Sequence, residues 1–267
     1  MNIPIKRAGL RIVAPILLSL CGALTAQAAD VHVLATGALS AAFRKIVPAF
    51  EASTGKRLIL SWGPSYGNSP DDLPVRIRNH EPMDVCFMIG AALDEQIRQG
   101  YFVEGTRTDV AISRIGIAVR AGVPKPDIGS VDAVRTALLG AHSIAFSEGA
   151  SGKYITETLF PKLGVADALQ RKTVQIKGKE LVGVALKRGD ADMGLQQISE
   201  LRAIDGIQYV GPLPETLQKV SVIAAAVARH AAEPDAASAL IRYLQTPEAK
   251  RILEQAGLDP VGGPAPQ

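Results

Sequence analysis

The sequence predicts an α/β protein with mixed, mostly parallel sheets, folded as two interleaved lobes. Short runs rich in β-branched residues alternate with amphipathic helical patterns along the chain, which is typical of α/β architecture. Without residues 1–28, whose pattern is described below, about 239 residues remain, which exceeds most single hydrophobic cores yet falls short of two average independent domains. Apolar residues make up 47% of the chain and charged residues 21%, as in ordinary globular proteins.

The first part of the chain predicts a strand, a helix, two further strands and a second helix. The strands are expected at 31–35, 57–62 and 85–89, where apolar and β-branched residues form short runs. Apolar residues from Leu39 to Phe50 fall on one face of a helix, which Gly55 ends and Pro48 kinks or shortens. The second helix is expected at 92–99.

The same alternation continues to the end of the chain. Further strands are predicted at 115–119, 143–146, 173–176, 193–196 and 220–227. Helices are predicted at 131–139, 153–163, 180–188, 235–245 and 248–256. No internal repeat is visible in the sequence.

Residues 1–28 have the pattern of a secretory signal peptide. Lys6, Arg7 and Arg11 precede an apolar run at 12–24, and a small-residue triplet follows at 26–28. The apolar run has about 13 residues, short of the roughly 20 that a bilayer-spanning helix needs, so we expect cleavage and no membrane insertion. The mature protein is therefore predicted to be periplasmic.

Removing this leader leaves a chain whose charges balance. The leader carries Lys6, Arg7 and Arg11 but no acidic residue, and the whole chain has 29 basic and 26 acidic residues. The remaining residues have no net positive charge, and a nucleic-acid-binding protein needs such an excess to bind a polyanion. The charge balance therefore argues against nucleic-acid binding. Cys86 is the one cysteine after the leader, and its apolar surroundings predict a buried side chain without a disulfide.

Three loops that follow predicted strands are rich in small polar residues. They lie at 35–40, 63–69 and 147–153. Ligands bind at the carboxyl ends of strands in open α/β sheets, and backbone N–H groups at a helix start can hold an anion. Any one of these loops could equally be a helix cap, but three in equivalent positions favour a binding site. Its candidate residues in the loops are Thr36, Gly37, Ala38, Ser65, Tyr66, Ser151 and Lys153.

Several motifs then occur in a characteristic order. They are the strand, polar turn and helix at 33–43, Ser-Trp-Gly-Pro-Ser at 61–65, Met-Asp-Val at 83–85, Arg-Gly-Asp-Ala-Asp-Met-Gly at 188–194, and the closing segment 243–257. In this order they resemble the periplasmic solute-binding proteins of the molybdate-binding family. The resemblance implies a two-lobed periplasmic-binding-protein type 2 fold with a ligand cleft between the lobes. The chain would cross between lobes near 112–119 and 220–227. Lobe one would comprise residues 29–114 and 226–267, and lobe two residues 115–225.

The family pattern changes at positions that contact the ligand. Ala38 and Gln197 stand where molybdate binders typically place a serine and a tyrosine. Lys153 and Lys179 add positive charge, and Arg114 lies near a crossing, although each cation could equally be a solvated surface residue. Such donors suit an organic acid with two or three carboxylates better than molybdate. The predicted binding residues are Thr36, Gly37, Ala38, Ser65, Tyr66, Arg114, Ser151, Lys153, Lys179, Gln196 and Gln197.

Segments 113–116, 194–201 and 211–214 resemble a side branch of this family, the aconitate isomerases. The resemblance implies an allylic proton shift between trans- and cis-aconitate. This reaction needs donors for three carboxylates and one group that removes and returns a proton. A buried lysine or carboxyl group can be tuned towards neutral pH for that purpose. The candidates for this group are Tyr66, Lys153, Lys179 and Glu148.

Two functions remain open from the sequence. In the first, the protein is a receptor that closes its lobes on a small organic anion and delivers it to an ABC-type permease. In the second, the same closure holds aconitate for proton transfer. Neither function requires a cofactor, and the four histidines are scattered without metal-ligand spacing, so no metal site is predicted. A monomer is expected.

Overall fold

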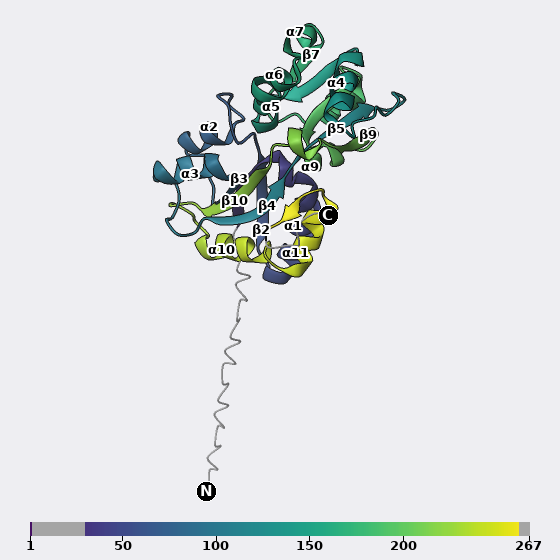
Figure 1. Cartoon of the computed structure of the whole chain (residues 1–267). Coiled ribbons are helices and arrows are strands. Elements are labelled where there is room, and N and C mark those ends of the chain that lie inside the picture. Colours follow the sequence, from purple (N-terminus) through teal and green to yellow (C-terminus); the bar gives the residue numbers. More distant parts are fainter. Residues whose placement is uncertain (2–29, 262–267) are drawn as a thin grey trace.

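The computed structural model describes Met1 and residues 30–261, which fold around two β-sheets in two lobes (Figure 1). The rest of the predicted signal peptide and the tail 262–267 lie outside the described residues. Lobe one contains a six-stranded sheet and lobe two a five-stranded sheet.

The sheet of lobe one has the strand order β11-β4-β10-β3-β1-β2. Its strands are β1 (Asp30–Ala35), β2 (Arg57–Trp62), β3 (Val85–Ile89), β4 (Thr108–Ser113), β10 (Ser221–Val227) and β11 (Asp259–Pro260). Strand β1 pairs in parallel with both β2 and β3, whereas β10 runs antiparallel between β3 and β4.

The sheet of lobe two has the strand order β7-β6-β8-β5-β9. Its strands are β5 (Ile115–Arg120), β6 (Ile144–Ser147), β7 (Thr173–Ile176), β8 (Met193–Gln197) and β9 (Ile207–Pro212). Strand β6 is parallel to β7 and β8, while β5 is antiparallel to β8 and β9. Both sheets are therefore mixed, and the antiparallel pairs involve strands that lie next to the crossings between lobes.

Helices cover both faces of the sheet of lobe one. They are η1 (Gly37–Leu39, a 3-10 turn), α1 (Ser40–Thr54), α2 (Leu73–Arg78), α3 (Gly90–Arg98), α10 (Pro234–Tyr243) and α11 (Pro247–Gln255). The alternation of side chains along β3 explains this layering. Phe87 packs in the cluster with α1, α10 and α11, whereas its neighbours Cys86 and Met88 pack in the cluster with α2 and α3. Cys86 is fully buried, as predicted.

The helices of lobe two are shorter. They are α4 (Val131–Gly140), α5 (Ala150–Tyr154), the π-helical turn η2 (Ile155–Leu159), α6 (Phe160–Leu163), α7 (Ala166–Leu169), α8 (Val182–Arg188), α9 (Ile198–Arg202) and the 3-10 turn η3 (Glu215–Leu217).

The sequence predicts one α-helix at 153–163, but the structure places a π-helical turn inside it. The N–H of Phe160 donates to the carbonyl of Ile155, five residues earlier. Pro161 has no N–H, so the carbonyl four residues before it cannot be paired as in an α-helix, and the preceding turn widens.

Two segments connect the lobes. Strand β4 ends at Ser113 and β5 begins at Ile115, so only Arg114 separates the two sheets there. The chain returns between Pro212, where β9 ends, and Ser221, where β10 begins. The predicted boundary between residues 225 and 226 falls inside β10, which belongs wholly to the sheet of lobe one. We therefore propose the return crossing at 213–220.

Candidate functional site

A cleft with about 510 Å³ of empty space, part of it open to solvent, lies between the two lobes. Its walls are the loops that follow β1 and β2 and the end of β3 in lobe one, and the loops that follow β6 and β7, the end of β8 and the start of α9 in lobe two. The lining residues are Thr36, Gly37, Trp62, Gly63, Pro64, Ser65, Ile89, Ser147, Gly149, Ala150, Ser151, Gly178, Lys179, Glu180, Leu181, Gln196, Gln197 and Glu200. Seven predicted binding residues, Thr36, Gly37, Ser65, Ser151, Lys179, Gln196 and Gln197, lie among them.

The wall from lobe one presents hydroxyl groups held by the backbone. The Ser65 hydroxyl accepts a hydrogen bond from the Ile89 N–H at 3.0 Å and is fixed against the end of β3. Thr36, also buried, is fixed by its own N–H, which donates to the Phe87 carbonyl at 2.8 Å. The structure does not bring Ala38 to the cleft, because its methyl group packs into the core of lobe one.

The wall from lobe two presents hydroxyl and amide groups. The hydroxyls of Ser147 and Ser151 lie 3.2 Å apart. The side-chain oxygen of Gln196 accepts a hydrogen bond from the Val182 N–H at 2.8 Å. The side-chain oxygen of Gln197 likewise accepts one from the Ser113 hydroxyl at 2.8 Å. Because both amide oxygens are occupied, their NH₂ groups are the ends left to donate to a neighbour.

Glu200 is a site residue that the sequence analysis missed. It lies on α9, lines the cleft and is only 9% exposed. Burial raises the pKa of its carboxyl group from the ordinary 4.5 to about 7, although hydrogen bonds from the Gln197 backbone and the Gln196 side chain oppose the shift. A methyl group on Gly37 would lie 2.8 Å from its Oε1 atom, so the carboxyl group faces that loop closely.

The predicted catalytic residue Glu148 has a different position. Its Oε1 atom accepts the Gly178 N–H at 2.5 Å and the Ser69 hydroxyl at 3.3 Å. Glu148 does not line the cleft, and these contacts tie together loops of the two lobes. Nearby, the Lys179 ammonium lies 3.7 Å from the Asp71 carboxylate, with both side chains largely exposed.

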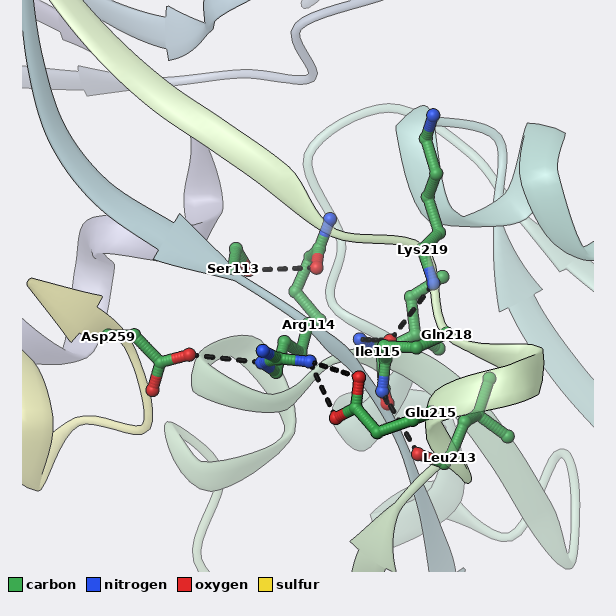
Figure 2. Close-up of polar contacts among 9 residues, drawn as sticks. Ser113, Arg114, Ile115, Leu213, Glu215, Gln218, Lys219 and Asp259 are labelled. Atoms are coloured by element: carbon green, nitrogen blue, oxygen red, sulfur yellow. Dashed lines mark hydrogen bonds and ion pairs between the residues drawn. The ribbon is translucent and has the colours of Figure 1, made fainter. Parts of the chain in front are cut away.

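Besides Ala38 and Glu148, three further predicted residues lie outside the cleft. Tyr66 and Lys153 line a neighbouring cavity, described below. Arg114 is held at the crossing, where its guanidinium group pairs with the Asp259 carboxylate at 3.0 Å and the Glu215 carboxylate at 2.8 Å (Figure 2). Arg114 is therefore a structural residue at this point, because both its partners are supplied by the protein.

The two crossing segments are also clamped to one another by Gln218. Its side-chain oxygen accepts the Ile115 N–H at 2.7 Å, and its NH₂ group donates to the carbonyls of Ile115 and Leu213 at 3.0 and 3.2 Å (Figure 2). These bonds join the start of β5 to the segment that leads into β10.

A family model described as bacterial extracellular solute-binding protein matches residues 31–259. The chain belongs to this family. Within it, the chain is 39% identical over 229 residues to an aconitate isomerase from a Pseudomonas species, a match that covers 86% of this chain and 87% of the relative. It is 25% identical over 242 residues to the molybdate-binding protein of Azotobacter vinelandii, covering 88% and 92% of the two chains.

The solved structure of the Azotobacter vinelandii periplasmic molybdate-binding protein superposes on this solute-binding protein with a TM-score of 0.71. The two are 20% identical, and the match covers 89% of this chain and 100% of that one. The predicted two-lobed periplasmic-binding-protein type 2 fold is thereby confirmed. Among the described residues, no helix is long and apolar enough to cross a membrane. Residues 30–261 also contain no group of three or more His, Cys, Asp or Glu side chains placed to hold a metal ion.

Proposed function

We propose that this solute-binding-family protein is a periplasmic isomerase that interconverts trans- and cis-aconitate in the cleft. The observation that carries the proposal is Glu200, a buried carboxyl group in the cleft whose pKa lies near 7. Such a group is populated in both its neutral and its ionised form near neutral pH, which is what removal and return of a proton require. The 39% identity to an aconitate isomerase supports the choice of substrate.

The reaction is an isomerisation, so substrate and product contain the same atoms. Ionised Glu200 takes a proton from the methylene carbon of aconitate, and the electron pair of that C–H bond forms a new carbon–carbon double bond. The electron pair of the former double bond then accepts a proton at the former vinyl carbon. Because the methylene and vinyl carbons exchange roles, the product can have either geometry, and Glu200 is regenerated when it gives its proton back.

The cleft would hold the carboxylates mainly with neutral donors. Among the described residues of its lining, Lys179 is the only cation, and Glu180 and Glu200 are also present. The hydroxyls of Ser65 and Ser151 and the amide of Gln197 are the remaining donors that we assign to the substrate. A Glu200 that can be neutral lowers the repulsion that a fully ionised carboxylate would exert on a polyanion.

The test follows the vinyl proton signals of trans-aconitate by NMR after addition of protein. We expect the cis isomer to form, and Glu200→Gln to slow its formation by about 100-fold or more, the usual contribution of a general base. The matched control is Glu180→Gln, which makes the same chemical change in the same cleft at a side chain paired with Arg188 at 2.6 Å. Full activity in Glu200→Gln would refute the assigned role.

The pH dependence gives an independent readout. Proton removal requires the ionised form of Glu200, so kcat/KM should rise as pH passes through about 7. A kcat/KM that is constant between pH 5.5 and pH 8.5 would contradict the assignment.

Mass analysis of protein recovered from the periplasm should in addition show removal of residues 1–28.

A second candidate function is a receptor that delivers an organic anion to an ABC-type permease. The family match over residues 31–259 favours it, because it places the chain among solute-binding proteins. In the same NMR experiment, this function predicts that the trans-aconitate signals broaden without appearance of the cis isomer.

A further inference from the structure

A second cavity, which we call the side cavity, lies next to the cleft and contains about 1120 Å³ of empty space, part of it open to solvent. Ile89 and Ala150 line both spaces and so mark the boundary between them. Tyr66 and Arg107 contribute from lobe one and the helical segment 150–158 from lobe two, while 219–222 leads from the crossing into β10.

Basic side chains outnumber acidic ones among the described residues that line the side cavity. Of the lining residues that the structure describes, Lys153, Lys219 and Arg107 are the cations and Glu157 is the only acidic residue, whereas the cleft lining has one cation and two carboxylates. Within residues 30–261, the ammonium groups of Lys153 and Lys219 have no hydrogen bond or ion pair. Figure 2 shows the Lys219 side chain extending away from the hydrogen bonds that Gln218 makes with Ile115 and Leu213.

Arg107 is paired with two carboxylates, which offset its charge, but one of its nitrogen atoms has no partner among the residues described. Its Nε and Nη1 atoms bind the carboxylates of Asp94 and Asp109 at 2.5 and 2.7 Å. Its Nη2 atom lies against Gly90, where an added Cβ would meet it at 2.9 Å, and it makes no hydrogen bond with the described part of the chain. The guanidinium group therefore has one edge left to donate at the wall of the side cavity.

Neutral donors lie in the same wall. Ser221 is only 6% exposed, yet its hydroxyl has no hydrogen-bond partner among the described residues. Helix α3 begins there with Gly90 and Ala91, without a capping side chain and without an acidic residue in its first turn. The first N–H groups of a helix lack intrahelical partners and favour negative charge.

We propose that the side cavity is a second anion-binding site, separate from the cleft, for an extended organic polyanion with two or three carboxylates. An extended ligand suits the site, because Lys153, Lys219 and Arg107 come from three different segments around a cavity with about 1120 Å³ of empty space. This inference does not depend on isomerase activity. A ligand there would bridge both lobes and the crossing, and would stabilise their arrangement.

The test uses tricarballylate, the saturated analogue of aconitate, which cannot undergo the proton shift. Isothermal titration of the whole mature chain should give two equivalents bound. In the double variant Lys153→Ala/Lys219→Ala, we expect one equivalent to be unchanged and the other weakened about ten-fold or more, since hydrogen bonds to charged groups are being removed. The control, Lys125→Ala/Lys187→Ala, removes two exposed lysines elsewhere and should retain both equivalents.

The inference is overturned if the Lys153→Ala/Lys219→Ala variant binds every equivalent seen with the unaltered protein at unchanged affinity, or if the unaltered protein binds no tricarballylate. Sulfate at matched ionic strength should leave the second equivalent bound, and displacement by sulfate would overturn the choice of an extended ligand. Since tricarballylate cannot isomerise, failure here says nothing against the proposed activity, and loss of that activity leaves this result unaffected.

Discussion

Glu200 makes the stability of the protein depend on pH in a direction opposite to that of most carboxyl groups. Its pKa is raised from 4.5 to about 7 because the side chain is buried. The folded state therefore binds a proton more tightly than the unfolded state between these two values. Stability is highest below pH 4.5 as far as this group is concerned, and it is lost as pH rises through about 7.

The size of the effect follows from the pKa difference. One pKa unit corresponds to about 1.4 kcal/mol, so the full loss is about 3 kcal/mol, of which about 2 kcal/mol falls between pH 5 and pH 8. Glu200→Gln keeps the shape of the side chain and removes its charge. The free energy of unfolding of this variant, relative to the unaltered protein, should therefore increase by about 2 kcal/mol between pH 5 and pH 8.

Urea unfolding at the two pH values measures this difference. The fluorescence of Trp62, the single tryptophan, reports on lobe one, and circular dichroism reports on the whole chain, so coincident transitions support two-state analysis. Glu180→Gln serves as the control, because Glu180 pairs with Arg188 near the surface and should show no such increase. An equal stability difference between Glu200→Gln and the unaltered protein at pH 5 and pH 8 would refute the reasoning.

Two further substitutions test the packing around the site. Ser113→Ala leaves the buried side-chain oxygen of Gln197 without its donor, so chemical denaturation should show a loss of about 1–3 kcal/mol. A loss below about 0.5 kcal/mol would mean that this bond contributes little. Gly152→Ala places a Cβ 1.4 Å from the Ser147 carbonyl oxygen and must displace backbone, so its melting temperature should fall by several degrees. In contrast, Gly140→Ala, in a helix with open space, should leave the melting temperature unchanged or raise it; equal melting temperatures for these two variants would contradict the argument.

Elements with strong hydrophobic periodicity could be predicted from sequence. Helix α1 buries Phe43, Ile46 and Phe50 on the predicted face. Strands β4 and β9 were not predicted, because their patterns are weaker. Strand β9 lies at a sheet edge, pairs on one side only and ends in Gly211 and Pro212, so neither burial nor strand propensity marks it clearly.

Helical geometry explains why only part of the site could be predicted. Ser151 and Lys153 belong to the same polar loop in the sequence, but in α5 they are two residues apart and so point about 200° from each other. Ser151 consequently faces the cleft and Lys153 the side cavity. The partners of Arg114 are distant in sequence, and their ion pairs could not be anticipated from local pattern.

Glu200 shows a different limit of sequence analysis. An acidic residue in the first turn of a helix is usually explained by its favourable interaction with the helix dipole. The signal that the sequence offers nearby is the run of mostly polar residues at 196–200, which spans the end of β8 and the start of α9. Burial of the carboxyl group results from the approach of Gly37 of lobe one, which sequence periodicity does not report.

The position of β10 has a consequence for the order in which the chain can fold. This strand joins β3 to β4 in the middle of the sheet of lobe one, although it follows all the strands of lobe two in sequence. A nascent chain that has not yet reached Ser221 therefore leaves β3 and β4 as unpaired edges, which are prone to aggregation. Lobe one can only be completed after synthesis of lobe two, and long-range pairing of this kind is slow.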